Sequence, residues 1–325
     1  MIVKLANPIT GATTVGISGV SGSPFQVVSF TGQPLTYGSG SSGEMLWMLF
    51  DGSRFQIINP PQALQANLTI YVNSSIGSDS YDGSQPTVSG TKGPLQHIQT
   101  AVNKAYNYPP SQYTITIQLA DGTYNESVYT PNFPGPGLVI NGHAGSPSNV
   151  LVTGANNAHT FAVNGPNSVT IQNLKVTTGT GIGPPCGFIA QGSGASLITQ
   201  NTVSGFCQYS VHEAYGPCFV SIGNHTYAGN FAQAYTSFFG GFIGLAQYAT
   251  YTIATPLTCS YWVDCSANGT LEVPVPGAPT FVNPGNVTGT KWLAQYNGCI
   301  ITQGSGVNYF PGNVAGFTSA GGQYD

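Results

Sequence analysis

Two carboxylates, Glu213 and Asp264, are the candidates for catalysis in this sequence. Each lies a few residues before a turn, in segments two repeats apart, so stacked strands would hold them about 10 Å apart on one face. Inverting glycoside hydrolases use two carboxyl groups roughly 6.5 to 9.5 Å apart, one as an acid and one to activate water. Tyr215 and Trp262 lie nearby in the sequence and would stack on sugar rings. The alternative interpretation is two isolated surface carboxylates, and alternation places His212 on the opposite face from Glu213.

Residues for other chemistry are sparse. Asp79 and Asp82 lie in a Gly/Ser loop and are candidate calcium ligands, because calcium prefers oxygen donors. The alternative is that both carboxylates accept hydrogen bonds from the backbone of their own turn. The five histidines lack metalloprotease or triad spacing, and no phosphate-binding loop is present in the sequence. We therefore expect no cofactor and favour a binding protein over an enzyme.

Six cysteines are scattered through the second half of the sequence without a Cys-x-x-Cys pair, which argues against a zinc site. We expect reduced and mostly buried thiols. A disulfide between Cys259 and Cys265 is the alternative.

The composition excludes several classes of partner. The chain has six Lys plus Arg and ten Asp plus Glu, only 5% of its 325 residues, against about 25% in an average protein. Nucleic acids and anionic membranes bind clustered Lys and Arg, so neither is an expected partner. With 41% hydrophobic residues and 44 Gly, the sequence favours an all-β protein with neutral outer faces. No signal peptide or membrane-spanning segment is visible, which predicts synthesis in a cytoplasm without membrane insertion.

A loose repeat runs from Gly137 to about Val273. Its glycine markers are 27, 24 and 25 residues apart, and its polar markers 28, 23 and 23 residues apart. The glycines are Gly165, Gly192, Gly216 and Gly241, and the polar residues are Asn173, Asn201, Asn224 and Gln247. A period of this length, with strand alternation and a turn in each repeat, predicts a parallel β-solenoid. About six coils fit this stretch, and the aromatic-rich coil from Phe231 to Tyr251 is expected to contact lateral partners.

The stretch from Ile70 to Glu126 combines a short strand, a Gly/Ser/Asp loop, one amphipathic helix and a second strand. The helix is predicted from Leu95 to about Tyr106, because apolar residues recur at helical spacing, and it would cover the open end of the coils. The phrases that carry the pattern are Tyr71-Val72-Asn73, Gly77-Ser78-Asp79, Asp82-Gly83, Ile98-Gln99, Ala101-Val102, Asp121-Gly122-Thr123-Tyr124 and Glu126. This pattern resembles the N-terminal part of right-handed parallel β-helix proteins of the pectate-lyase-like superfamily. The resemblance implies that fold and leaves the activity open.

Both ends of the chain resemble parts of bacteriophage proteins. The N-terminal residues form short strand-like runs, and the phrase Met48 to Gln56, with its Asp51-Gly52 turn, resembles a hairpin of small β modules in phage fibre and tail proteins. Any two-stranded hairpin is the alternative. Near the C-terminus, Asn308-Tyr309-Phe310-Pro311-Gly312 and Gly321-Gly322-Gln323-Tyr324 resemble the ends of tail-fibre and β-helix virion proteins. A flexible surface tail is the alternative there.

We therefore expect four parts in an all-β chain with a right-handed parallel β-helix. Residues 1–62 form an N-terminal β attachment module, with a boundary at Asn59-Pro60-Pro61-Gln62. Residues 63–136 begin the β-helix and carry its capping helix, residues 137–283 form the parallel β-helix, and residues 284–325 form a C-terminal cap or trimerisation segment.

The resemblances imply a virion protein of a bacteriophage, made in the host cytoplasm. The expected role is structural and adhesive, as a tail fibre, tailspike or capsid-decorating fibre. The expected form is a homotrimer that contacts other virion proteins through its N-terminal module and binds a host surface glycan or protein. A tailspike polysaccharide depolymerase, either a hydrolase or a lyase, is the alternative function. A secreted pectate-lyase-like enzyme is disfavoured by the sparse charge and the missing signal segment.

Overall fold

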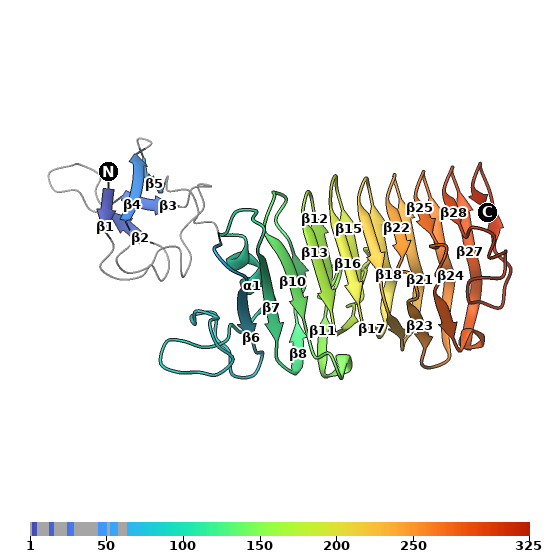
Figure 1. Cartoon of the computed structure of the whole chain (residues 1–325), viewed down its shortest axis with the longest axis horizontal. Helices are drawn as coiled ribbons and strands as arrows, with labels where there is room; N and C mark the ends of the chain where they lie inside the picture. The colour runs from blue at the N-terminus through green and yellow to red at the C-terminus, as the bar shows by residue number, and fades with distance from the viewer. Residues whose placement is uncertain (1, 5–12, 16–24, 29–44, 51–52, 58–63) are drawn as a thin grey trace.

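The computed structural model describes residues 2–4, 13–15, 25–28, 45–50, 53–57 and 64–325 (Figure 1). Within these residues the chain is all-β with one α-helix, and its strands form one five-stranded sheet and three parallel sheets of ten, seven and eight strands. The three parallel sheets together form a solenoid, as the repeat predicts.

The five-stranded sheet is built from the N-terminal residues. Its strands are β1 (Ile2–Lys4), β2 (Thr13–Val15), β3 (Phe25–Val28), β4 (Met45–Phe50) and β5 (Phe55–Ile57), in the order β1-β4-β5-β3-β2. Strands β4 and β5 pair antiparallel, with Phe50 opposite Phe55 and their ring centroids 4.9 Å apart. The expected Asp51-Gly52 turn between them and the boundary at residues 59–62 lie outside the described residues.

Each full coil of the solenoid contributes one strand to each parallel sheet. The ten-stranded sheet contains β6 (Leu68–Val72), β7 (Thr114–Leu119), β10 (Gly137–Asn141), β13 (Ser168–Gln172), β16 (Ser196–Gln200), β19 (Phe219–Ile222), β22 (Phe242–Leu245), β25 (Thr270–Glu272), β28 (Cys299–Ile301) and β30 (Gln323–Tyr324). The seven-stranded sheet contains β8 (Gly122–Asn125), β11 (Val150–Thr153), β14 (Lys175–Thr177), β17 (Thr202–Ser204), β20 (His225–Tyr227), β23 (Thr250–Ile253) and β26 (Thr280–Val282). The eight-stranded sheet contains β9 (Val128–Tyr129), β12 (Phe161–Asn164), β15 (Phe188–Gln191), β18 (Cys207–Tyr215), β21 (Phe231–Phe238), β24 (Leu257–Ser266), β27 (Val287–Gln295) and β29 (Phe317–Thr318).

Apolar residues of successive coils lie opposite one another inside the solenoid. In the ten-stranded sheet one such row is Leu138, Val169, Leu197, Val220, Ile243, Leu271 and Ile300. All of these side chains are buried. Strands β7 and β30 extend the stacking beyond residues 137–283, so the flanking segments also contribute strands to the solenoid.

The helix α1 (Ile98–Ala105) packs against β6, β7 and β9 at the first coil (Figure 1). Its buried residues are Ile98, Ala101, Val102 and Ala105, and the preceding Leu95 is buried as well. The helix therefore covers the beginning of the solenoid core with the apolar face that its spacing predicts.

Neutral amides stack along the outside of the turns. Asn173 and Asn201 adopt positive φ values of 61° and 50°, which asparagine tolerates better than most residues. The Asn201 Nδ2 group donates to Asn173 Oδ1, and Asn173 Nδ2 donates to Asn141 Oδ1, both at 2.7 Å. These bonds link three successive coils without any charge.

The C-terminal residues fold back onto the last coils. Tyr324 on β30 stacks on Trp292 with ring centroids 4.1 Å apart, and Phe310 is buried. The hydroxyl of Tyr309 donates to the carbonyl of Pro279 at 2.8 Å. The structure therefore shows a packed segment where a flexible tail was the alternative.

All six cysteines are free thiols, and four of them are buried, as expected. Cys259 and Cys265 do not form a disulfide.

Candidate functional site

The two candidate carboxylates lie on one outer row of the eight-stranded sheet. Glu213 on β18 pairs in register with Thr236 on β21, and Thr236 pairs with Asp264 on β24. One strand therefore separates the two acids, which places their Cα atoms about 10 Å apart at ordinary strand spacing. Their side chains are only 4% and 6% exposed.

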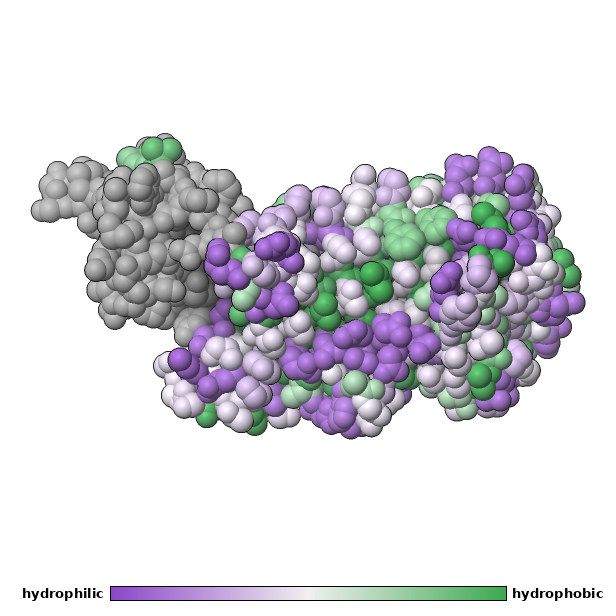
Figure 2. Space-filling view, in the orientation of Figure 1, coloured by the Kyte–Doolittle hydropathy of each residue, from purple (hydrophilic) through white to green (hydrophobic). Residues whose placement is uncertain are grey.

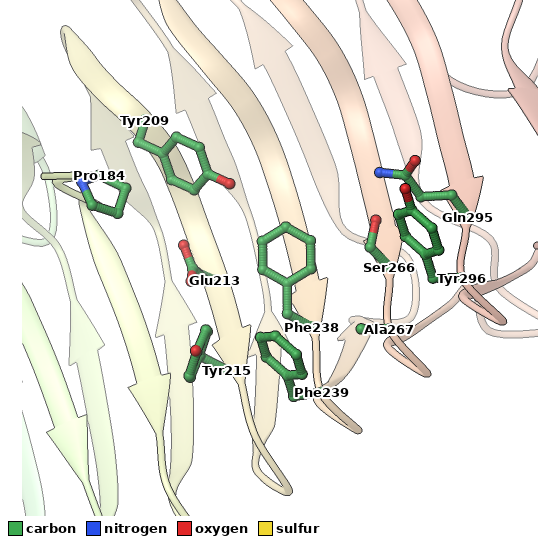
Figure 3. A pocket seen from close by; sticks show the side chains of 10 residues that line it. All are labelled: Pro184, Tyr209, Glu213, Tyr215, Phe238, Phe239, Ser266, Ala267, Gln295 and Tyr296. Carbon is green, nitrogen blue, oxygen red and sulfur yellow. The ribbon is translucent and has the colours of Figure 1, made fainter. Parts of the chain in front are cut away.

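A surface pocket of about 370 Å³ opens at Glu213, the member of this row that lines it (Figure 3). We call it the aromatic pocket, because five of its ten lining residues carry aromatic rings. Its lining residues are Pro184, Tyr209, Glu213, Tyr215, Phe238, Phe239, Ser266, Ala267, Gln295 and Tyr296. In Figure 3 the Glu213 carboxylate lies between the rings of Tyr209 and Tyr215. No Lys or Arg lines the pocket, and Figure 2 shows hydrophobic residues in green over the middle of the visible solenoid face.

The rim of the aromatic pocket is built from the end of β18 and from the turns that follow β21, β24 and β27. In two of these turns an aromatic residue has a left-handed backbone: φ is 52° at Phe239 and 49° at Tyr296. Large side chains rarely adopt this conformation, and it is costly. In the intervening coil the same position is Ala267, with φ 49°. The pocket therefore has a small residue flanked by two exposed rings along the solenoid axis.

Glu213 lies in an environment that disfavours its charge. Burial is the main cause that raises the pKa of its carboxyl to about 7, and the nearby carboxyl of Asp264 raises this pKa further. The Cys186 thiol donates to Glu213 Oε2 at 2.8 Å and opposes that shift. Burial also raises the pKa of Asp264, although the Ser266 hydroxyl donates to its Oδ1 at 2.6 Å. Both acids are thus shifted toward the neutral form.

Both strands that carry these acids contain register irregularities. One lies between Cys207 and Ser210 on β18, and one lies between Thr258 and Tyr261 on β24. Such bulges bend a strand and redirect its side chains, and they are common beside functional sites.

Comparison with protein-family models, curated proteins and solved structures found no match. None of the helices in the described part of the chain has the length and apolar character needed to cross a membrane.

Of the two predicted glycan-stacking residues, the structure places one in the pocket. Tyr215 is 44% exposed and its ring packs edge-on against Phe239, with centroids 5.1 Å apart. Trp262 is instead a core residue with 0% exposure, and its ring centroid lies 4.8 Å from that of Tyr227. The irregularity of β24 lies just before Trp262, and both Trp262 and Val263 face the interior. Trp262 is therefore not available to a ligand.

The loop carboxylates of Asp79 and Asp82 are occupied by hydrogen bonds. Asp79 Oδ1 accepts from the backbone N–H groups of Gln96 and His97, each at 3.1 Å. Asp82 Oδ1 accepts from the backbone N–H and the hydroxyl of Ser84. Across the described residues, no group of three or more His, Cys, Asp or Glu side chains is placed to hold a metal ion. The contacts of Asp82 match the turn interpretation, because Ser84 is two residues away. Asp79 instead accepts hydrogen bonds from Gln96 and His97, which lie directly before helix α1 and not in its own turn.

The remaining pocket residues were not singled out by the sequence as a site. Phe238 and Phe239 belong to the aromatic-rich coil, whose members divide between the core and the surface: Tyr235 is buried, whereas Phe239 is 57% exposed. Tyr209 and Tyr296 were missed. Tyr296 lies in the turn after β27 at the position that Ala267 has after β24, so alignment of successive turns would find it. Tyr209 lies in the register irregularity between Cys207 and Ser210, and strand alternation gives no signal for it.

Proposed function

We propose that this protein binds a neutral glycan in the aromatic pocket and serves as an adhesive structural protein of a bacteriophage particle. The observation that carries the binding proposal is a pocket that is lined by aromatic rings, has no Lys or Arg in its lining, and lies on long, paired strands. Aromatic faces pack on the apolar faces of sugars, and tyrosine hydroxyls supply hydrogen bonds. A rigid sheet holds the rings in place before binding, which lowers the entropic cost of association.

The virion assignment rests on the resemblances of the chain's ends and of the stretch from Ile70 to Glu126. We propose that the N-terminal sheet attaches to other virion proteins and that the chains form a homotrimer. The solenoid would wind to the right, as nearly all parallel crossovers do. Synthesis would take place in the host cytoplasm. A host surface protein in place of a glycan is the alternative target, and it would bind without any host polysaccharide.

The test compares the full chain with two tyrosine variants for binding to host surface polysaccharide. Tyr215→Ala removes a pocket ring, and we expect at least tenfold weaker binding, which corresponds to about 1.4 kcal/mol. The matched control is Tyr248→Ala, because Tyr248 is 75% exposed and lies outside the pocket. It should bind as the unchanged protein does. Equal loss in both variants, or binding to host protein alone, contradicts the glycan proposal.

Salt provides an independent check. Stacking and neutral hydrogen bonds are little affected by ionic strength, whereas ion pairs between exposed charges are screened. We expect similar affinity at low and high salt. A steep loss of binding with added salt would count against a neutral interface.

A glycoside hydrolase is the second candidate, and one observation favours it. Burial raises the pKa of Glu213 to about 7, as a general acid requires, and Asp264 lies two strands away, with only β21 between them. Incubation of the protein with the same polysaccharide, followed by a reducing-end assay, separates adhesion from cleavage. New reducing ends that disappear in Glu213→Gln and Asp264→Asn support hydrolysis, and unchanged chains support adhesion alone.

A further inference from the structure

Glu213 is the one carboxylate among the residues that line the aromatic pocket. Its Oε2 accepts the hydrogen bond from Cys186, whose side chain is fully buried. Its Oε1 has no hydrogen-bond partner within the described residues, although the carboxyl belongs to the pocket lining. One oxygen is thus held by the protein, and the other is left for a ligand.

The groups around Glu213 provide no positive charge. Cys186 faces it from the segment before β15, Tyr209 and Tyr215 lie on β18, and Asp264 lies on β24. Across the interposed strand β21 the register neighbour is Thr236, which is neutral. Cys218, before β19, is also close enough that the charge of Glu213 raises the pKa of its thiol. An ionised Glu213 would therefore be a desolvated anion beside another acid, which is unfavourable.

We infer that Glu213 enters the complex as an uncharged carboxylic acid and donates its O–H to an acceptor oxygen of the bound sugar. This inference rests on the glycan-binding function proposed above. It makes Glu213 a specificity residue: the pocket accepts neutral oligosaccharides and rejects those that carry uronic-acid carboxylates. A second anion in a ring-lined pocket without Lys or Arg would have no counter-charge.

The same chemistry makes binding depend on pH. Because the pKa of Glu213 is raised to about 7, the fraction of free protein in the donating form falls as the pH rises through neutrality. Apparent affinity scales with the competent fraction, so binding should be about 30-fold weaker at about pH 8.5 than at about pH 6. The sign is opposite to that expected if Glu213 bound as an acceptor.

The experiment uses the full chain and a printed array of neutral and uronic-acid-containing bacterial oligosaccharides at both pH values. The key variant is Glu213→Gln, which keeps a hydrogen-bond donor of similar shape but does not titrate. We expect it to bind the same neutral sugars with equal affinity at the two pH values. The matched control is Glu272→Gln, because Glu272 lies outside the pocket. It should keep the 30-fold dependence on pH, about that of the unchanged chain.

The outcomes separate the inference from the function. If the chain binds neutral sugars equally at both pH values, or prefers uronic acids, the inference is overturned and glycan binding stands. If Glu213→Gln keeps the pH dependence, another group is responsible and the inference fails. If no sugar binds at either pH, the proposed function and this inference both fail.

A spectroscopic titration supplies a readout that needs no ligand. The chain has four glutamates, Glu44, Glu126, Glu213 and Glu272. Carboxyl-¹³C labelling of glutamate gives few signals, and the one missing from Glu213→Gln is assigned to Glu213. A midpoint near neutrality supports the inference, whereas ionisation at the ordinary pKa of about 4.3 overturns it.

Discussion

The inner and outer faces of the same three strands differ in what surrounds their ionisable groups. On the inner row His212, Tyr235 and Val263 lie in register and are 0% exposed. On the outer row Glu213 and Asp264 flank Thr236, and Glu213 lines the aromatic pocket. Neighbouring residues in the sequence thus point into a closed core and toward an open site.

Burial moves pKa values on both faces toward the neutral form. It lowers the pKa of His212 well below its usual value, and the nearby His225 adds to that effect. It raises the pKa of Glu213 to about 7. A perturbed pKa therefore does not distinguish structure from function in this protein. The difference is access: the imidazole of His212 contacts Thr199 and Phe188, whereas Glu213 lines the pocket.

The largest effect on stability is expected on the inner face. Trp262→Ala should lower the free energy of unfolding by about 3 to 5 kcal/mol, because it removes a fully buried ring and leaves a cavity. Chemical denaturation measures the change. Tyr248→Ala, at an exposed ring, is the control and should stay within about 0.5 kcal/mol. An equal decrease in the free energy of unfolding in the two variants would contradict the assignment of Trp262 to the buried core.

The second largest effect on stability is expected from acid, which acts through the buried histidines. The folded-state pKa of His225 falls to about 3 from 6.5, and that of His212 also falls, so the unfolded chain takes up protons that the folded core excludes. The two neutral histidines therefore contribute fully to the free energy of unfolding above pH 6.5, and this contribution is lost as the pH falls toward about 3. The expected slope is up to about 1.4 kcal/mol per pH unit for each histidine. Denaturant unfolding at several pH values measures the slope.

Glu213 on the outer face titrates with the opposite sign and serves as the internal control. Its folded-state pKa of about 7 exceeds the ordinary 4.5, so its contribution is complete below pH 4.5 and is lost as the pH rises through 7. It therefore offsets part of the acid loss from the histidines. Glu213→Gln removes that offset and should make the acid loss steeper. A profile that becomes flatter in this variant would contradict the assignment of charges to the two faces.

Much of the fold was predictable because each coil repeats the same local pattern of alternating strand residues and a turn. The spacing of Gly165, Gly192 and Gly216 predicts one turn per coil, and all three have positive φ values. In the next coil the left-handed positions are Phe239 and Gly240, so Gly241 does not have that role. Alternation also predicts that His212 and Glu213 face opposite ways, as they do.

The pocket was less predictable because it depends on register between distant segments. Tyr215, Phe239 and Tyr296 lie in three different coils, and only the strand pairing of β18, β21, β24 and β27 brings their turns into one row. Local irregularities add to this. The inward position of Trp262 follows a register shift on β24 that no alternation pattern reveals.

Loss of the contact between Glu126 and helix α1 should have a smaller effect on the free energy of unfolding. Glu126 accepts from the backbone N–H groups of Ile98 and Gln99 at 2.8 and 2.9 Å, so Glu126→Ala leaves two helix donors without a partner. We expect a loss of about 1 to 2 kcal/mol. Glu126→Gln keeps one acceptor and should lose less. The calcium interpretation has its own test. Added calcium or a chelator should leave the unfolding midpoint unchanged, because the carboxylates of Asp79 and Asp82 already accept hydrogen bonds from backbone N–H groups. A midpoint that rises with calcium would revive the metal interpretation.

The smallest effect on stability should come with a large effect on binding. Phe239→Gly replaces a left-handed phenylalanine by the residue best suited to that backbone, so the fold should be unchanged or gain up to about 1 kcal/mol. The exposed ring of Phe239 is lost from the pocket rim, so glycan binding should weaken at least tenfold, or about 1.4 kcal/mol. Tyr248→Gly is the matched control, with φ 56° and an exposed ring outside the pocket. It should show the same stability change and unchanged binding. If the two variants bind glycan equally well, the strained ring at the rim has no part in recognition.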